Sequence, residues 1–243
     1  MRRRFFVDRF EAESATLRGD AADHLGRVLR AESGQLYELS DGNSVWLGRV
    51  EQIALSKRGG SRIEFSLVEH VPAREAWLHL NLLISIVKFN RFEWCLEKAT
   101  ELGVTEIIPL AAARADKALV AAAAKRRERW EKIVLESAEQ SRRLRPPVMR
   151  APVRPAHAFA ESDAGVRILL SERRDAKPVR AALKGAKGTS AALAIGPEGG
   201  WSDDEFAAAR AAGYIETSLG ENILRTETAV IAGLSLARFS LGD

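Results

Sequence analysis

The sequence predicts an α/β domain built on a mostly parallel sheet and preceded by a small β-barrel. Residues 1 to about 70 read as short strands separated by turns, which is typical of an all-β unit. From Trp77 onward, apolar strand patterns alternate with patterns of helical period. Such alternation favours parallel strands that helices cover on both faces. We therefore expect two domains, at residues 1–71 and 75–243, joined by a linker at 71–75.

The first domain is expected to contain short strands and one helix. The clearest strands are expected at residues 35–39, 44–50 and 62–68, and the helix at 20–30. Residues 41–43, Asp-Gly-Asn, supply a turn between the first two strands. The strand at 62–68 alternates polar and apolar residues, so we expect one of its faces to be buried.

The second domain is expected to alternate strands with helices. The strands are expected at residues 77–87, 104–110, 167–170, 191–195 and 214–219. The helices are expected at residues 92–102, 118–143, 202–213 and 228–239. Ser202 and Glu205 have the spacing of a capping box, which predicts a helix start at Ser202. Pro146 and Pro147 end the pattern of the longest helix.

Composition and cysteine usage indicate a globular protein of a reducing compartment. Hydrophobic residues make up 46% of the chain and charged residues 29%, which is ordinary for a globular protein. No apolar run reaches the roughly 18 residues that a membrane span needs. Cys95 is the single cysteine, so a disulfide framework is excluded and a cytoplasmic location is expected. The four histidines are scattered, and we expect no metal site.

The formal net charge of +4 hides an uneven distribution. Residues 125–154 hold ten Lys or Arg and four Glu, so the rest of the chain carries about −2. A local basic surface of this kind is typical of phosphate attraction. A solvated helix face with i,i+4 ion pairs, such as Glu128 with Lys132, would explain it equally. No aromatic residue is interleaved in the basic cluster at 142–145, so nothing supports stacking of single-stranded bases on it.

A glycine-rich loop follows the expected strand at 191–195. Its sequence is Gly196-Pro197-Glu198-Gly199-Gly200, in which proline fixes one φ angle and glycine allows close backbone approach. Such a loop can wrap a flat ligand with its amide and carbonyl groups. It matches neither a P-loop nor the G-x-G-x-x-G dinucleotide motif. Taken alone, it is also explained as a tight turn between a strand and a helix.

A second loop precedes the last expected helix. Arg225, Thr226, Glu227 and Thr228 place a cation beside a carboxylate and two hydroxyls. Helix capping would account for Thr226 and Glu227 but not for Arg225, because a cation is unfavourable at a helix start without an anionic partner. In open α/β sheets, ligands bind at the carboxyl ends of strands. The two loops together therefore predict a ligand site.

These loops resemble those of the SPOUT class of S-adenosylmethionine-dependent RNA methyltransferases. More narrowly, the chain resembles the 16S ribosomal RNA uridine-N3 methyltransferase family over nearly its whole length. Five motifs carry the resemblance. They are His-Leu-Gly-Arg-Val-Leu-Arg at 24–30, Lys-Ala-Thr-Glu-Leu-Gly-Val at 98–104, Glu-Gln-Ser-Arg-Arg at 139–143 with Pro147 after it, Gly-Pro-Glu-Gly-Gly at 196–200, and Leu-Arg-Thr-Glu-Thr-Ala at 224–229.

The resemblance implies a SPOUT-type fold with a C-terminal trefoil knot, a PUA-like RNA-binding barrel at the N-terminus, and a homodimer with its sites beside the subunit interface. It implies S-adenosyl-L-methionine as cofactor, 16S rRNA of the small ribosomal subunit as partner, and no membrane. The implied cofactor-binding residues are Leu169, Leu170, Ile195, Gly196, Pro197, Glu198, Gly199, Gly200, Leu219, Gly220, Ile223, Leu224, Thr228 and Ala229. The implied RNA-binding residues are Arg2, Arg3, Arg4, His24, Arg27, Arg30, Lys88, Arg114, Arg142, Arg143 and Arg145.

The implied chemistry assigns roles to three residues. The N3 atom of uracil carries a proton and lies on the Watson–Crick edge, so the base must be unpaired before it reacts. We expect Arg225 to stabilise the charge that deprotonation leaves on the carbonyl oxygens. We expect Glu198 or Glu227 to assist the deprotonation. A ribose 2′-O-methyltransferase of the same class and a non-catalytic ribosome-assembly factor are the alternatives.

The chain departs from the pattern of the family at three places. Glu221 and Asn222 stand where proline and arginine are common, which weakens the case for a phosphate contact from that loop. Ala115 replaces a common serine after Arg114, so we expect no role for Ala115. Residues 88–91, Lys-Phe-Asn-Arg, replace a turn that is richer in glycine.

Overall fold

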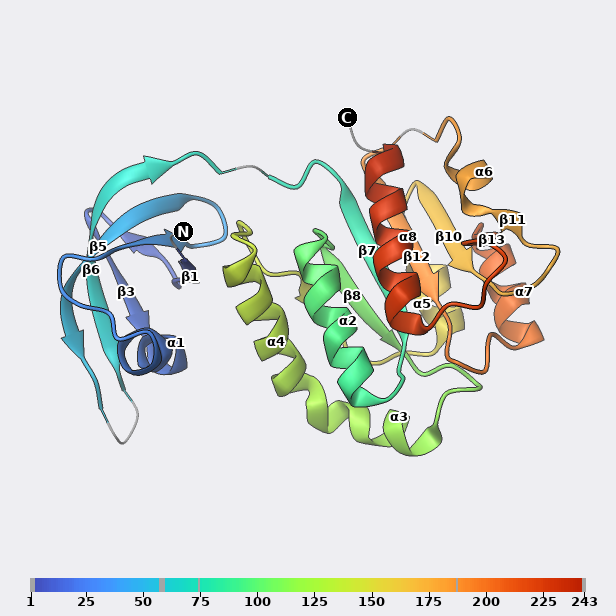
Figure 1. Cartoon of the computed structure of the whole chain (residues 1–243), viewed down its shortest axis with the longest axis horizontal. Coiled ribbons are helices and arrows are strands. Elements are labelled where there is room, and N and C mark those ends of the chain that lie inside the picture. The colour runs from blue at the N-terminus through green and yellow to red at the C-terminus, as the bar shows by residue number, and fades with distance from the viewer. Residues whose placement is uncertain (1–2, 57–59, 74, 187, 242–243) are drawn as a thin grey trace. The chain divides into compact units, whose positions relative to one another are not determined.

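The computed structural model describes residues 3–56, 60–73, 75–186 and 188–241 (Figure 1). These residues form two compact units. Unit 1 comprises Met1–Glu75 and Ala138–Pro146, and unit 2 comprises Ala76–Ser137 and Pro147–Asp243. The stretch at 138–146 thus belongs to the N-terminal unit, although the sequence predicted it as part of the second domain.

Unit 1 is a six-stranded sheet with a short helix. The strands are β1 (Arg4–Phe6), β2 (Phe10–Glu11), β3 (Ser14–Arg18), β4 (Leu36–Ser40), β5 (Val45–Ala54) and β6 (Arg62–Val71). Their order is β1-β4-β5-β6-β3-β2, and only the β1–β4 pair is parallel. Phe5, Leu39 and Phe65 belong to the core of this sheet. Because β1 and β2 are its edges, closure into a barrel stays a prediction.

The expected helix at 20–30 is shorter and less regular than its sequence suggests. It consists of α1 (Gly19–Asp23) followed by a π-helical turn, η1 (His24–Val28). Leu25 is buried in the unit 1 core, whereas Val28 is exposed. Arg30 has a φ of +53°, so the helix cannot continue through it.

Unit 2 contains a seven-stranded, wholly parallel sheet, which confirms the predicted α/β class with a mostly parallel sheet. The strands are β7 (His79–Ser85), β8 (Glu106–Leu110), β9 (Val148–Met149), β10 (Val166–Leu170), β11 (Lys177–Pro178), β12 (Ser190–Ile195) and β13 (Ile215–Ser218). Their order is β11-β13-β10-β12-β7-β8-β9. The later strand β12 is therefore inserted between β7 and the earlier strand β10.

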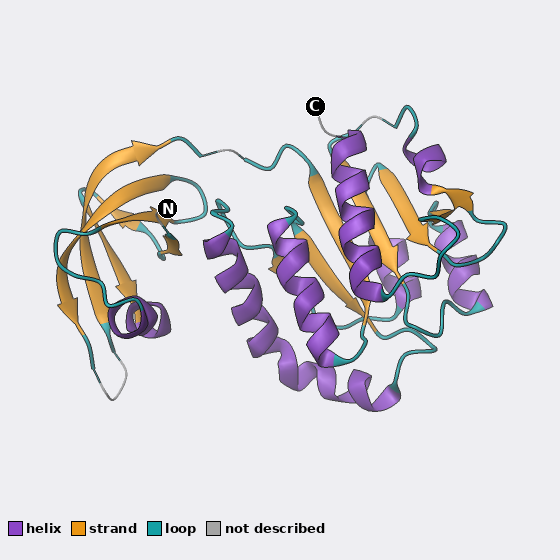
Figure 2. Cartoon of the chain, in the orientation of Figure 1, coloured by secondary structure: helices purple, strands orange, loops and turns teal. Residues whose placement is uncertain are grey.

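The helices of unit 2 cover both faces of this sheet (Figure 2). They are α2 (Phe89–Glu101), α3 (Lys117–Ala123), the 3₁₀ turn η2 (Ala124–Arg126), α4 (Arg127–Gln140), α5 (Pro155–Glu161), α6 (Val179–Leu183), α7 (Asp203–Ala211) and α8 (Thr226–Leu241). Leu82 and Leu193 face the core cluster of α2 and α8, whereas Leu83 and Ala194 face that of α5 and α7. This alternation on adjacent strands follows from the period of two in a strand.

The prediction of one continuous helix at 118–143 is wrong. The 3₁₀ turn η2 separates α3 from α4. Asp116 caps α3 by accepting hydrogen bonds from the backbone amides of Ala118 and Leu119. At the turn, the Arg126 guanidinium lies 4.7 Å from the ring centroid of Phe89.

Candidate functional site

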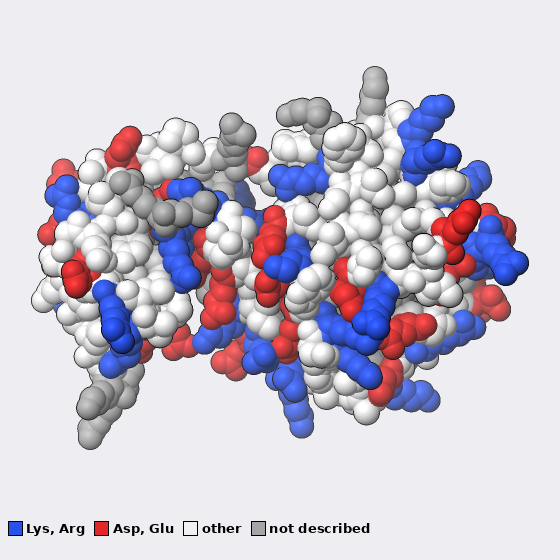
Figure 3. Space-filling model, viewed as in Figure 1, with Lys and Arg blue, Asp and Glu red and all other residues white. Residues whose placement is uncertain are grey.

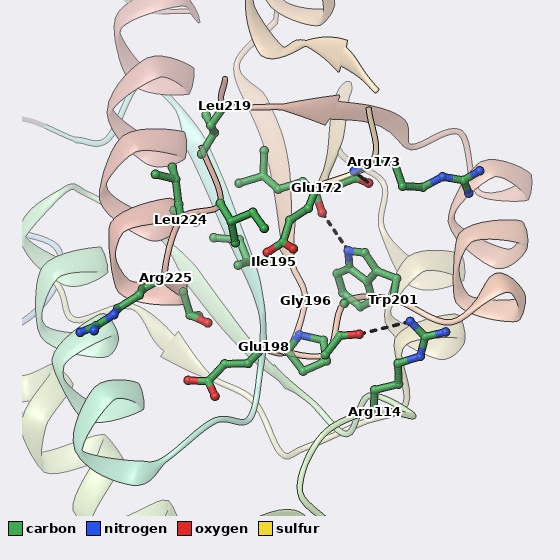
Figure 4. A pocket seen from close by; sticks show the side chains of 18 of the residues that line it. Arg114, Glu172, Arg173, Ile195, Gly196, Glu198, Trp201, Leu219, Leu224 and Arg225 are labelled. Atoms are coloured by element: carbon green, nitrogen blue, oxygen red, sulfur yellow. Dashed lines mark hydrogen bonds between the residues drawn. The ribbon is translucent and has the colours of Figure 1, made fainter. Parts of the chain in front are cut away.

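A cavity of about 740 Å³ lies at the carboxyl ends of three neighbouring strands of unit 2 (Figure 4). The loops that follow β12, β10 and β13 form its walls, and Arg91 and Arg114 complete the lining. Because β10 lies between β12 and β13 in a parallel sheet, the three loops leave from the same edge. This is the edge at which α/β sheets bind ligands.

The glycine loop at 196–200 is held tightly by its surroundings. A Cβ atom on Gly196 would lie only 3.0 Å from Cε2 of Trp201, so the indole packs directly against the loop. The Trp201 Nε1–H donates to the carbonyl oxygen of Leu170 at 2.9 Å and ties this loop to β10. Gly200 has a φ of +70°, a conformation that glycine adopts at no steric cost.

Sequence reasoning missed Trp201 as a wall of the cavity, although a signal was present. Trp201 precedes the helix cap Ser202, and Phe206 occupies the fourth helical position. This is the spacing of a hydrophobic staple, and both side chains are buried in one cluster. Glu172 and Arg173 were missed as well, and both follow β10 directly at the edge where its neighbours carry the predicted loops.

The predicted capping box at the start of α7 is confirmed and does more than cap the helix. Ser202 Oγ accepts from the Glu205 amide, and Glu205 Oε2 accepts from the Ser202 amide. The second oxygen, Oε1, accepts from the Ala113 amide at 2.8 Å. Nearby, Arg114 Nη1 donates to the carbonyl oxygen of Gly199 at 3.2 Å. The loop after β8 is thereby fastened to the glycine loop.

The second loop forms the apolar side of the cavity. In Figure 4 the side chains of Leu219, Leu224 and Ile195 lie together on this side. Leu219 and Leu224 also pack against the main core cluster. Helix α8 begins at Thr226, and the Arg225 carbonyl accepts from the Ala229 amide at 2.9 Å. Arg225 therefore sits just before the helix, the position that the capping interpretation had given to Thr226.

Arg91 lies between the two candidate bases. Its Nη1 donates to the Glu198 carboxylate, and its Nε is 4.0 Å from Oε1 of Glu227. The side chains are 29% exposed for Arg91, 54% for Glu198 and 20% for Glu227. Glu198 lines the cavity, whereas Glu227 does not. Sequence reasoning noted residues 88–91 as a departure from the family pattern and assigned Lys88 to RNA binding, but it gave Arg91 no role.

Arg225 lines the cavity but directs its charge elsewhere. Figure 4 shows its side chain extending away from Gly196 and Trp201. The residue is exposed, and its guanidinium has no ion pair or hydrogen bond within the described part of the chain. The anionic partner that its position called for is thus not supplied by described residues of this chain.

Two predicted cofactor-binding residues do not line the cavity. Leu169 points to the opposite face of the sheet and is buried in the cluster of α5 and α7, because neighbouring residues of a strand face opposite sides. Thr228 is exposed on α8 outside the lining. The structure therefore does not place either residue at the cavity. The other predicted cofactor-binding residues line the cavity.

Two residues predicted to bind RNA, Arg4 and Arg142, meet at one carboxylate but differ in exposure. Both guanidiniums bond to the Glu38 carboxylate, and Arg4 also donates to the carbonyl oxygen of Arg142 at 2.6 Å. Arg4 is only 7% exposed and Glu38 only 4%. Arg4, which is buried and bonded in this way, has no free donor face for a phosphate. The Arg142 side chain is 41% exposed, and its RNA contact stays a prediction. Arg2 lies outside the described residues.

The other residues predicted to contact RNA are more accessible than Arg4. Arg3 Nη1 lies 3.5 Å from Nε2 of His24. Arg27 bonds to Asp23 and to the Ser56 carbonyl. Exposed positions are held by Arg3, Arg27, Arg30, Lys88, Arg114 and Arg145, with His24 and Arg143 half-buried.

Much of the basic stretch at 125–154 is paired with acidic side chains. Arg129 forms a two-pronged hydrogen bond to Glu93, and Arg127 pairs with Glu131. Figure 3 shows Lys and Arg mixed with Asp and Glu on the face in view. For this helix, the interpretation as an ion-paired solvated face is the one that the contacts support.

Cys95 carries no chemistry for the site at neutral pH. Burial and, second, the charge of Glu227 raise the pKa of its thiol to about 12. The thiolate is the reactive form of cysteine, so this side chain is inert near pH 7. Among the described residues, no helix is long and apolar enough to cross a bilayer, and no group of three His, Cys, Asp or Glu side chains has a metal-binding arrangement.

Comparison with known proteins identifies similar sequences and structures. A sequence model of the RNA methyltransferase domain matches residues 74–238. The ribosomal RNA small subunit methyltransferase E of Synechocystis is 34% identical over 227 residues, covering 91% of this chain and 72% of that protein. The protein of the same name from Neisseria gonorrhoeae, solved with bound S-adenosyl methionine, is 29% identical with a TM-score of 0.85, covering 100% and 99% of the two chains. A Legionella pneumophila protein solved with SAM is also 29% identical, with a TM-score of 0.87 and the same coverage.

Proposed function

The chain belongs to the RNA methyltransferase domain family, and we propose that it transfers a methyl group from S-adenosylmethionine to N3 of a uridine in 16S ribosomal RNA. The observation that carries the proposal is the cavity at the ends of β12, β10 and β13, with its glycine loop and apolar wall. The name of the Synechocystis relative and the cofactor bound in both solved neighbours support it.

The lining fits the proposed cofactor. Gly196 leaves the backbone open where any Cβ would press on Trp201, and the apolar side chains opposite suit the face of an adenine ring. Glu172 and Asp203 bring carboxylates to the lining, which suits a positively charged ligand. When bound, S-adenosylmethionine supplies an electrophilic methyl group on a charged sulfur. Methyl transfer then depends chiefly on how accurately the residues of this chain hold the base in line with that group.

Glu198 is the better candidate for proton removal from N3. It lines the cavity and is more exposed than Glu227, so an unpaired uracil can reach it. Loss of the N3 proton leaves negative charge on the neighbouring carbonyl oxygens. Arg225, exposed beside the cavity, would stabilise this charge when RNA is bound. That role provides the anionic partner that its position before α8 calls for.

The exposed basic residues are proposed to hold the RNA backbone. Lys88 and Arg114 belong to unit 2, and Arg114 lines the cavity. The unit 1 candidates are Arg3, His24, Arg27, Arg30, Arg142, Arg143 and Arg145. Contacts of this kind neutralise phosphates and release counterions, so the affinity should fall steeply with salt. The strands of unit 1 support a PUA-like RNA-binding role for this part.

A C-terminal knot is part of the proposal, and the strand order supports it. The chain leaves β13 on the far side of β10 and then enters α8, which packs against α2 and β12. It therefore crosses the ends of β10 and β12, as a threaded segment would.

A homodimer is proposed from the apolar surface of α8 and the loop before it. Ile223 is 77% exposed and Phe239 is 85% exposed, and Leu236 and Trp94 are partly exposed. Apolar side chains that gather on a surface mark protein–protein contact sites. Of these residues, Ile223 lines the cavity, so an interface that includes it would lie next to the ligand site. A cytoplasmic location completes the proposal, because rRNA and reduced Cys95 belong to that compartment.

The test is methylation of defined RNA with a mapped product. The purified protein would be incubated with methyl-labelled S-adenosylmethionine and small ribosomal subunits from a strain that lacks it. We expect one uridine to acquire the label and to stop reverse transcription, because a methyl group on N3 blocks Watson–Crick pairing. A labelled nucleotide that does not stop reverse transcription, and whose neighbouring phosphodiester resists alkaline cleavage, would indicate the 2′-O alternative. RNA binding without any label transfer would indicate an assembly factor.

A further inference from the structure

Arg91 occupies a rigid position beside the cavity. It is the third residue of α2, and its amide donates to the Lys88 carbonyl oxygen at 2.9 Å in the first turn. On the same turn, Phe92 is fully buried, and its ring lies 4.6 Å from that of Trp130, centroid to centroid. The backbone of Arg91 is therefore held in place by the packed first turn of α2, and a residue that positions other groups requires such support.

From this position Arg91 reaches two loops that the sheet brings together. The Glu198 carboxylate comes from the glycine loop after β12, and the Glu227 carboxylate comes from the first turn of α8. Glu198 lies 107 positions from Arg91 in the sequence. The guanidinium is a planar fork with several donors, so it can hold two carboxylates at once, which a lysine ammonium does less specifically.

Arg91 supplies the positive charge that pairs with both carboxylates. Among the described residues, Arg91 is the cation that forms an ion pair with both Glu198 and Glu227. Oε2 of Glu227 is buried and has no hydrogen-bond partner among the described residues. Removal of a cation from a partly buried carboxylate leaves that carboxylate uncompensated, which is strongly unfavourable.

The same helix carries an ion pair that serves as a reference. Arg129 bonds Glu93 of α2 in two-pronged geometry, and neither residue lines the cavity. Arg91 and Glu198, in contrast, both line it. A purely structural pair has no need to stand at the ligand site.

We propose that Arg91 is a positioning residue: it fastens the glycine loop and the start of α8 to α2 and thereby sets the direction of the Glu198 carboxylate over the cavity. This inference rests on the proposed function, and it deepens it by naming the group that orients the base. Two walls of the cofactor cavity depend on Arg91, so both cofactor affinity and turnover should respond.

The experiment compares Arg91→Gln, Arg91→Lys, Glu198→Gln and the double variant Arg91→Gln/Glu198→Gln with the control Arg129→Gln. Calorimetry gives the Kd for S-adenosylmethionine without RNA, and single-site methylation assays give kcat and KM for RNA. We expect Arg91→Gln to weaken cofactor binding about tenfold and to lower kcat by about a hundredfold, with KM for RNA little changed. Arg91→Lys should recover part of both losses, and Arg129→Gln should match the wild type.

The double variant decides whether Arg91 acts through Glu198. We expect Arg91→Gln to reduce kcat far less when Glu198 is already glutamine, because coupled residues are not additive. Equal reductions in both backgrounds, or cofactor binding as strong as in Arg129→Gln, would overturn the proposal. If Arg91→Gln does not fold, Arg91→Lys with Glu198→Gln carries the same comparison. A wild-type protein that binds the cofactor without methylating RNA would refute the proposed function, and the calorimetric result would still judge Arg91.

Discussion

Two triads of charged side chains occupy the two units, and they differ in how water reaches them. In unit 1, Arg4 and Arg142 flank Glu38, and their side chains are 8% exposed for Arg4, 41% for Arg142 and 5% for Glu38. In unit 2, Glu198 and Glu227 flank Arg91, and their exposures are 54%, 20% and 29%. The first triad holds 138–146 against β1 and β4, whereas the second stands at a cavity. The two triads therefore differ in their central charge, because Glu38 is buried whereas Arg91 is accessible at the cavity.

Electrostatics follow the same division. Burial and, second, the charge of Arg142 lower the pKa of the Arg4 guanidinium, so the pair is retained against a desolvation cost. Because Glu38 offsets that cost, removal of Glu38 should leave the buried Arg4 without its counter-charge.

Glu38→Ala should therefore produce the largest effect. We expect the free energy of unfolding to fall by about 3–5 kcal/mol, the usual result of breaking a buried ion pair. Urea denaturation followed by circular dichroism measures it. As a control, Glu64→Ala removes the exposed partner of Arg62 from the same sheet and should change stability little. An equal fall in the free energy of unfolding in both variants would show that the burial of Glu38 does not strengthen its contribution to stability.

Gly196→Ala should act on the cavity rather than on stability. Its Cβ would lie 3.0 Å from the Trp201 ring and push the indole from its bond to the Leu170 carbonyl. We expect the affinity for S-adenosylmethionine to fall about tenfold or more, which corresponds to about 1.4 kcal/mol.

Gly165→Ala is the matched control for that variant. Gly165 lies directly before β10, at the amino-terminal end of the strand and away from the cavity. A Cβ there would lie 3.6 Å from its nearest neighbour, an ordinary contact. Its cofactor affinity should equal that of the wild type in calorimetry. If Gly165→Ala weakens binding as much as Gly196→Ala, close packing on Trp201 is not the reason for the glycine.

Asp23→Asn should produce the smallest effect, and its pH dependence sharpens the contrast with Glu38. Hydrogen bonds from Arg27 and, second, from Ser61 lower the pKa of Asp23. A carboxyl group with a lowered folded-state pKa stabilises the protein above its unfolded pKa, and that contribution is lost as the pH falls through the folded value. The Tm difference between wild type and variant should thus be small at neutral pH and vanish in acid. A difference that grows as the pH falls would contradict this assignment.

The local elements of both units were accessible from patterns in the sequence. The strand pattern at 191–195 and the capping box at Ser202 gave β12 and α7 nearly at their observed bounds, because period and cap residues act within a few positions. The expected continuous helix at 118–143 failed at η2, since a short 3₁₀ turn leaves the helical period almost intact.

The sequence by itself determined the parallel α/β class and the two loops that line the cavity, since alternation, glycine and capping signals are local. Only the tertiary structure decided which charges meet. Arg4 finds Glu38 across 34 positions, and Arg91 finds Glu198 across 107. Such pairs depend on the order of the strands and on which side chains become buried. Neither can be predicted from a short stretch of sequence. The folded chain therefore buries Arg4, which the sequence assigned to RNA binding, and places Arg91, to which the sequence gave no role, at the cavity.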